Sequence, residues 1–237
     1  MNRTMLSTVL LIGTMLFPFA VSADDYDRAV QAAKIGHGAE AKSILTKLAE
    51  KGDVRAQAQL GELYISNGKN DQDRREGVRW IKAAAEKGNA IAQYNLGNLF
   101  LDGKLVPLDH KAAMDWLLKA AAQNVPEAQL NIASMFADGE GVPQDFKEAA
   151  NWLKLAASNG NNDAQIALGR AYAQGIGVEK DPLRGFMWGQ IAAETSPMTE
   201  GEKKQVRELA EKSLTKEDLI QANQMVKKCR DSKLKDC

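Results

Sequence analysis

The residues best suited to covalent or redox chemistry in this sequence are two cysteines near its end. Cys229 and Cys237 are the only cysteines among 237 residues. Their spacing is not the Cys-x-x-Cys of redox motifs, and no histidine is near enough in sequence to suggest a metal site. In an exported chain such a pair favours a structural disulfide. A continuous helix would hold the two Cα atoms about 12 Å apart, so we expect the helix to end soon after Cys229 and residues 230–236 to turn back.

Histidine is the side chain most often used for acid–base catalysis, and the sequence has only His37 and His110. Both lie near predicted turns, far apart along the chain, so we expect solvent-exposed side chains and no shared site. No phosphate-binding glycine loop is present, and no Ser-x-x-Lys occurs with its supporting motifs. We therefore expect no enzyme, no cofactor and no bound metal.

The charge balance bears on the class of partner. Lys and Arg together number 31, as do Asp and Glu, so the formal net charge is zero. Nucleic-acid binders normally carry a basic excess, which argues against a nucleic-acid partner. The charged fraction of 26% is ordinary for a folded protein.

Residues 1–23 are typical of a secretory signal peptide. Arg3 precedes an apolar stretch from Met5 to Ala20, and Val21-Ser22-Ala23 offers the small residues that signal peptidase accepts. The stretch is shorter than the roughly 20 residues that span a bilayer. We therefore expect a cleaved periplasmic protein with no integral membrane segment. An uncleaved anchor and release to the exterior remain as alternatives.

A step of 36 residues organises most of the remaining chain. All four tryptophans follow it, at Trp80, Trp116, Trp152 and Trp188. An Ala-Gln pair recurs with the same step, at Ala56-Gln57, Ala92-Gln93, Ala128-Gln129 and Ala164-Gln165. A fixed period of this length is typical of stacked helical units.

Each unit is predicted to contain two helices. In the first, residues such as Ala56, Leu60, Gly61 and Tyr64 fall on one apolar arc, and the glycine would let a neighbouring helix approach closely. The second helix carries the tryptophan, which we expect to pack in the core; a ligand-stacking ladder is the alternative. We expect the repeated glutamine to bridge adjacent helices, with a plain exposed position as the alternative.

Recurrent polar and glycine residues predict where the second helices begin and end. The expected C-terminal residues with positive φ are Gly52, Gly88, Asn124 and Gly160. The expected N-caps are Asp73, Asp109, Asp145 and Asp181.

The shared residues resemble the Sel-one-like repeat, a subclass of tetratricopeptide-type repeats. The motif is well matched in Ala92–Ala121, Ala128–Ala157 and Ala164–Ala193, whereas Asn70-Asp71-Gln72 replaces its Gly-Val segment in the Ala56 unit. The resemblance implies an all-α, TPR-like αα-superhelix with first helices on its concave wall. It also implies a scaffold for protein contacts and no particular chemistry.

The repeat divides the chain into a signal peptide, a degenerate unit, four full units and a cap. Capping boxes at Thr199 and Thr215 predict two helices in the cap. The boundaries are 1–23, 24–55, 56–91, 92–127, 128–163, 164–195 and 196–237.

The face of each first helix opposite its apolar arc is the candidate partner-binding surface, with a solvated polar face as the alternative. Amide side chains there both donate and accept hydrogen bonds, which suits the backbone of an extended peptide. The candidate residues are Gln59, Glu62, Tyr94, Asn95, Asn98, Asn131, Ser134 and Arg170.

These features predict a monomer that binds a protein or peptide in the cell envelope. The alternatives are a secreted host-interaction factor and, less favoured, a β-lactam-binding or β-lactam-hydrolysing enzyme. Relatives described in that last way carry a cysteine pair in each repeat, which this chain lacks.

Overall fold

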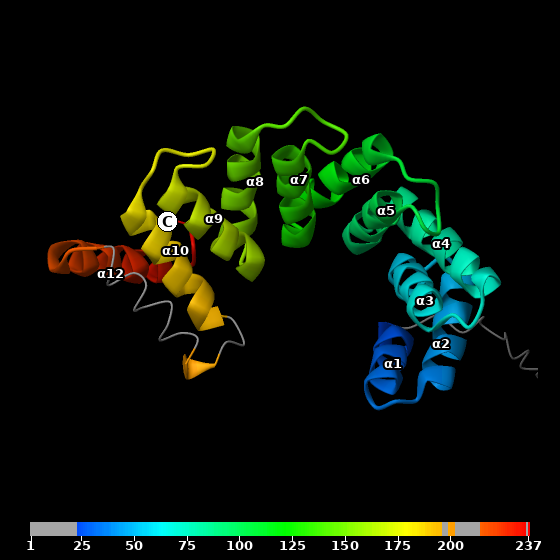
Figure 1. Ribbon diagram of the computed structural model, residues 1–237. Coiled ribbons are helices and arrows are strands. Elements are labelled where there is room, and N and C mark those ends of the chain that lie inside the picture. The colour runs from blue at the N-terminus through cyan, green and yellow to red at the C-terminus, as the bar shows by residue number, and fades with distance from the viewer. Residues whose placement is uncertain (1–22, 196–198, 202–213, 236) are drawn as a thin grey trace, which may run out of the picture.

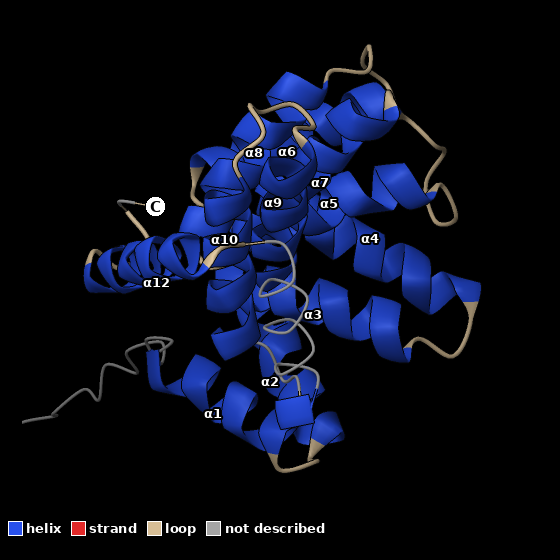
Figure 2. Cartoon of the chain, turned by 60° about the vertical axis from the view of Figure 1, so that its left-hand side comes forward, coloured by secondary structure: helices blue, strands red, loops and turns tan. Residues whose placement is uncertain are grey.

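The computed structural model describes residues 23–195, 199–201, 214–235 and 237. Its helices follow the chain in pairs, and Figure 2 shows no strand in the part that is described. The bounds are α1 (Ala23–Lys34), α2 (Gly38–Glu50), α3 (Val54–Asn67), α4 (Asp71–Glu86), α5 (Ala90–Asp102), α6 (His110–Ala122), α7 (Pro126–Asp138), α8 (Phe146–Ser158), α9 (Asn162–Gln174), α10 (Pro182–Thr195) and α12 (Lys216–Asp231). Residues 1–22 of the predicted signal peptide, and Glu202 of the first predicted capping box, lie outside this part.

The helix pairs stack along an arch (Figure 1). First helices such as α3 and α5 lie toward its inner side, and their partners α4 and α6 lie toward the outer side. The fold is therefore the expected all-α superhelix of helical hairpins. No described helix is long and apolar enough to cross a membrane.

Small residues set the distance between the two helices of a unit. A Cβ atom on Gly61 would come within 2.8 Å of the backbone nitrogen of Ile81 and 2.9 Å of the carbonyl oxygen of Gly77. Real Cβ atoms essentially never approach so closely, so the α3–α4 contact requires glycine. The same role falls to Gly169 and Gly185 between α9 and α10. The predicted close approach is confirmed.

The repeated tryptophans pack on the core, each against a cluster that includes residues of the preceding helices. Trp80, Trp116 and Trp152 are half-buried at its edge, whereas Trp188 is 3% exposed. Trp188 shares its cluster with Val226 of α12. Cations lie over two of the half-buried rings: Arg79 Cζ is 5.2 Å from the ring centroid of Trp80, and the Lys119 amine is 3.7 Å from that of Trp116.

The glutamines form a buried ladder. Each donates from Nε2 to the carbonyl oxygen of the alanine eight residues before it, at 3.0–3.2 Å, so that the last turn of one second helix is tied to the next first helix. In three units the glutamine oxygen accepts from the residue 30 positions later, namely Gln123, Asn159 or Thr195. The predicted bridging is confirmed.

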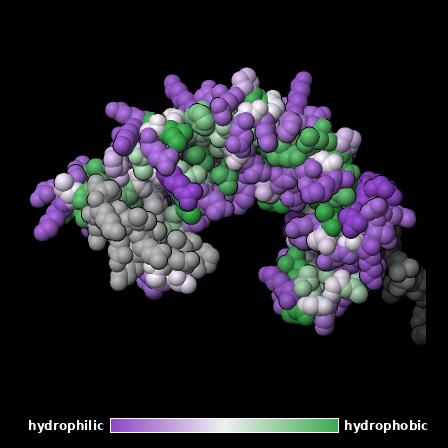
Figure 3. All heavy atoms as spheres, viewed as in Figure 1, coloured by the Kyte–Doolittle hydropathy of each residue, from purple (hydrophilic) through white to green (hydrophobic). Residues whose placement is uncertain are grey.

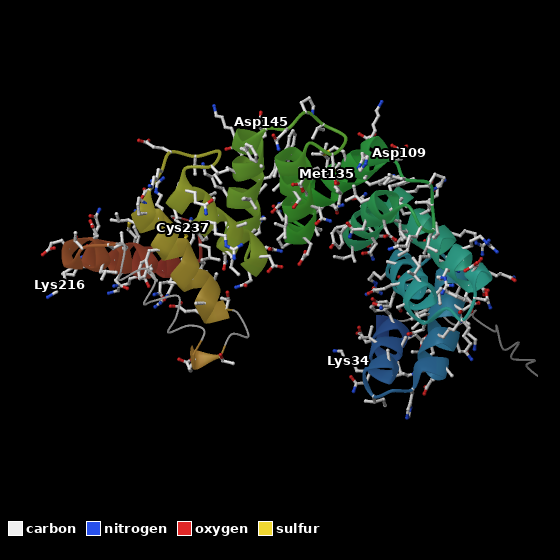
Figure 4. All side chains as sticks on the ribbon, in the orientation of Figure 1. Lys34, Asp109, Met135, Asp145, Lys216 and Cys237 are labelled. Carbon is white, nitrogen blue, oxygen red and sulfur yellow. A yellow bond between two sulfur atoms is a disulfide. The ribbon has the colours of Figure 1, made fainter. Side chains whose placement is uncertain are left out.

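The helices begin and end at the predicted residues, with one exception. Gly52, Gly88, Asn124 and Gly160 have positive φ at the expected positions. Asp109 and Asp145 cap α6 and α8 along one edge of the arch (Figure 4), and Asp181 accepts from the Arg184 amide. The prediction for Asp73 is wrong.

Asn70 caps α4 in its place, accepting from the Asp73 amide at 2.9 Å, while Asp73 accepts from the Lys69 amide. The helix begins earlier in this unit because Asn70-Asp71-Gln72 replaces the longer Gly-Val loop of the other units.

The C-terminal cap packs α12 on α10. Thr215 and Asp218 form the expected capping box. The helix ends at Asp231, Lys233 and Leu234 adopt positive φ, and the chain turns back. This brings Cys229 and Cys237 to a Cα separation of 4.8 Å, where they form the predicted disulfide.

Candidate partner-binding site

The inner side of the arch carries a hollow of about 280 Å³ between α3 and α5. Three predicted residues, Glu62, Asn95 and Asn98, line it. The rest of its lining mixes apolar and polar side chains: Ile65, Ile81 and Leu99 with Ser66 and Asp102. The structure therefore joins part of the predicted surface into a concave site with a partly apolar lining.

The lining follows from helical spacing. Ser66 lies one turn after Glu62, and Leu99 and Asp102 lie one turn after Asn95 and Asn98. These neighbours were not predicted, although the same i,i+4 step would have found them. Ile81, which is fully buried, comes from α4 and has no sequence signal that points to this hollow.

An amide pair connects this hollow to the next unit. Asn131 Nδ2 on α7 donates to Asn98 Oδ1 on α5 at 2.6 Å. Both side chains are half-buried. The bond leaves the Nδ2 of Asn98 as a donor and the Oδ1 of Asn131 as an acceptor, which is the pair of groups that an extended peptide backbone can satisfy.

The charges at the rim are acidic. Glu62 is exposed and forms no ion pair within 4.0 Å in the described residues, whereas Asp102 accepts from Lys104 at 2.5 Å. A partner segment that brings a cation or several N–H groups would therefore match this hollow better than an acidic one.

The other predicted residues lie apart from the hollow. Tyr94 is half-buried and packs against the core cluster of Leu117 and Ile132, so it supports α5. Gln59 is half-buried, and Ser134 and Arg170 are exposed on α7 and α9. These last three continue the series of first-helix positions beyond the hollow.

The described residues contain no group of three or more His, Cys, Asp or Glu side chains that could hold a metal ion. His37 is exposed, with its Nδ1 3.7 Å from Glu40. His110 was expected in solvent but is half-buried, because the Gly141 loop of the next unit packs against its Cβ atom.

Comparison with known families matches the repeated part of the chain. The Sel1 repeat profile covers residues 54–89, 90–125, 126–161 and 162–194, which is more than half of the sequence. The chain belongs to the Sel1 repeat family. Each Sel1 segment begins at the first residue of a first helix: Val54, Ala90, Pro126 or Asn162.

Solved Sel1 repeat structures share the fold. A Sel1 repeat protein from Oxalobacter formigenes is 28% identical, with a TM-score of 0.66 over 71% of this chain and 69% of that one. A Sel1 repeat protein from Klebsiella pneumoniae is 22% identical, with a TM-score of 0.51 over 77% and 91% of the two chains.

A third structure is c5321, a protective antigen present in uropathogenic Escherichia coli strains. It is 26% identical, with a TM-score of 0.50 over 80% of this chain and 48% of its own length. This Sel1 chain thus spans about half of c5321. A search among curated proteins gives no match.

Proposed function

We propose that the protein is a periplasmic scaffold or regulator that binds an extended protein segment on its inner face, without catalysis of its own. Sel1 repeats are scaffolds of the protein-interaction type, and stacked helices offer a continuous surface. The observation that carries the proposal is the hollow between α3 and α5, bordered by the amides of Asn95 and Asn98.

The chemistry of the hollow defines the partner segment. Ile65 and Leu99 would receive one apolar side chain, and the amides would bind the adjacent backbone. The carboxylate of Glu62, which forms no ion pair with the part of the chain that the structure describes, would receive a lysine or arginine. A short basic–apolar segment in an extended conformation meets these three requirements.

The proposal is tested by capture from the cell envelope with the mature chain, residues 24–237. The double variant Asn98→Ala/Asn131→Ala should lose capture of the partner while keeping its helical circular dichroism. Asp115→Ala on α6 removes an exposed side chain from a second helix and is the matched control. Equal capture by all three proteins would exclude this surface.

The periplasmic location and the monomeric state belong to the same proposal. The apolar segment and the small residues of positions 1–23 support export. Fractionation should recover the protein in the periplasm, and sedimentation should give the mass of one chain.

A secreted host-interaction factor is the second candidate, supported by the similarity to the antigen c5321. Recovery of the protein mainly from the culture supernatant would favour it over the periplasmic scaffold.

A further inference from the structure

A second hollow, larger than the inner-face site, lies between α8 and the loop that joins α9 to α10. Its volume is about 600 Å³. The loop lies against the start of α8, and a Cβ on Gly177 would fall on the carbonyl oxygen of Phe146. The loop is the yellow segment next to α8 in Figure 1.

Cationic side chains dominate this hollow. Lys147, Lys154, Lys180 and Arg184 line it, against the two carboxylates of Glu179 and Asp181. Arg184 pairs with Asp181 at 3.5 Å. None of the three lysines forms an ion pair within 4.0 Å among the described residues, so their charges are available to a ligand.

An aromatic ring forms part of the hollow. Tyr172 is 7% exposed, and its ring centroid lies 5.9 Å from Lys154 Nζ and 5.5 Å from Arg184 Cζ. These cation–π contacts hold two of the cationic groups on opposite walls, one on α8 and one on α10.

The repeat supplies an internal comparison. Four cations and two carboxylates give this hollow a charge of 4 − 2 = +2. The positions 36 residues earlier contain one cation, Lys111, and three carboxylates, Asp115, Asp145 and Glu148, which gives 1 − 3 = −2. The positions 72 residues earlier are positive again, with Arg75, Arg79 and Lys82 against Asp109. The positive charge is therefore a property of some units and is no general consequence of Sel1 packing.

The positions of two lysines along α8 favour an extended anion. Lys147 and Lys154 are seven residues apart on one helix, which separates their Cα atoms by about 10.5 Å. Carboxylates three residues apart in a polyproline II segment lie on one face about 9 Å apart. A single small anion would not cover this length as readily as an extended acidic peptide.

We propose that this hollow is a second binding site, which takes an extended acidic segment of a protein partner. The side chains of the segment would pair with Lys147 and Lys154, and its chain would lie between α8 and the loop that joins α9 to α10. This site differs from the inner-face hollow in position and in sign of charge, so each can fail without the other.

The test uses fluorescence anisotropy of the mature chain with a labelled peptide, Glu-Gly-Gly-Glu-Gly-Gly-Glu, at low salt. Lys147→Gln/Lys154→Gln should weaken binding about tenfold, equivalent to the loss of two modest ion pairs. The matched control is Lys111→Gln/Lys82→Gln, which removes two amines at corresponding positions of other units. It should change the affinity less than about twofold.

Three results would overturn the proposal. The first is no binding by the wild-type chain. The second is equal weakening by the control pair, which would indicate nonspecific attraction. The third is full competition by inorganic phosphate at concentrations where chloride of equal ionic strength does not compete, which would indicate a small-anion site. Unchanged binding by Asn98→Ala/Asn131→Ala is expected, since those residues belong to the other hollow.

Discussion

Asn131 on α7 donates a 2.6 Å hydrogen bond to Asn98 on α5, so that two first helices of successive units are joined on the inner side of the arch. The bond uses Nδ2 of Asn131 and Oδ1 of Asn98, and it orients Oδ1 of Asn131 and Nδ2 of Asn98 for a partner. In Figure 3 polar side chains cover most of the visible surface, with smaller apolar areas between them. The hollow between α3 and α5 combines both kinds of surface in one concave place.

The glutamine ladder has one incomplete step, and its repair should stabilise the protein. Gln57 Oε1 is buried and has no hydrogen-bond partner among the residues that the structure describes. Lys87 occupies the position that Gln123 fills one unit later, where Gln123 donates to Gln93 at 2.7 Å. Lys87→Gln should supply the missing donor and raise the free energy of unfolding by about 1 kcal/mol.

Urea denaturation measures this change. Lys87→Ala is the control, because it removes the same amine without adding a donor. If Lys87→Gln were no more stable than Lys87→Ala, the ladder would not extend to this unit in solution.

The glycine contacts predict that Gly61→Ala destabilises the protein more than Gly169→Ala. Gly61→Ala would gain up to about 1 kcal/mol of helix propensity, but its Cβ would overlap backbone atoms of Ile81 and Gly77. We expect a net loss of about 1–3 kcal/mol in unfolding free energy. Gly169→Ala should lose less, since its nearest neighbour, the Gly185 oxygen, is 3.1 Å away. Thermal denaturation of both variants measures the difference. A larger loss of stability in Gly169→Ala than in Gly61→Ala would contradict the packing argument.

Asp53 is the N-cap of α3, and its carboxylate should make the free energy of unfolding depend on pH. Burial alone would raise the pKa of Asp53, but its hydrogen bond from the Ala56 amide and the adjacent Arg55 guanidinium hold that pKa below its usual value. The pKa of Asp53 is lower in the folded than in the unfolded chain. Its carboxylate therefore adds to the free energy of unfolding above about pH 4, and this contribution is lost as pH falls through the folded pKa.

Asp53→Asn is the matched variant, since Asn89 caps α5 at the corresponding position. Its unfolding free energy should fall less than that of the wild type between about pH 5 and about pH 3. An equal fall of unfolding free energy in the two proteins would show that other carboxylates cause the acid sensitivity.

The disulfide should hold the C-terminal cap more than the rest of the arch. Cys237→Ser opens the loop but keeps the fully buried Cys229 as an apolar core residue. We expect a local loss of about 2–3 kcal/mol. Faster amide hydrogen exchange should therefore appear in α12, with little change in α3 to α8, because each unit contacts mainly its neighbours. Unchanged exchange in α12 would show that packing alone holds the cap.

Much of this fold can be read from the sequence because periodicity constrains each unit in the same way. Gln129 illustrates this: the repeated glutamine predicted a bridge between adjacent helices, and the structure shows a buried hydrogen bond from Gln129 to the carbonyl oxygen of Ala121. Asp73 illustrates the limit: a shorter loop starts α4 at a different residue, and the repeat register no longer applies there.

The candidate site was predicted less completely than the fold. The helix face that includes Glu62, Asn95 and Asn98 follows from the apolar arc, but the depth of the hollow depends on Ile81 from the adjacent helix. The half-buried Tyr94 was predicted on this surface, and the structure adds that its ring packs against the core cluster of Leu117 and Ile132.

Site-specific photo-crosslinking in intact cells tests the central claim most directly. A photoreactive residue would replace Asn95 in the inner-face hollow, and in a second protein it would replace the exposed Asp115 on α6. We predict a discrete crosslinked protein partner from position 95, lost on adding Asn98→Ala/Asn131→Ala, and none from position 115. A partner captured from position 115 but not from position 95 would contradict binding on the inner face.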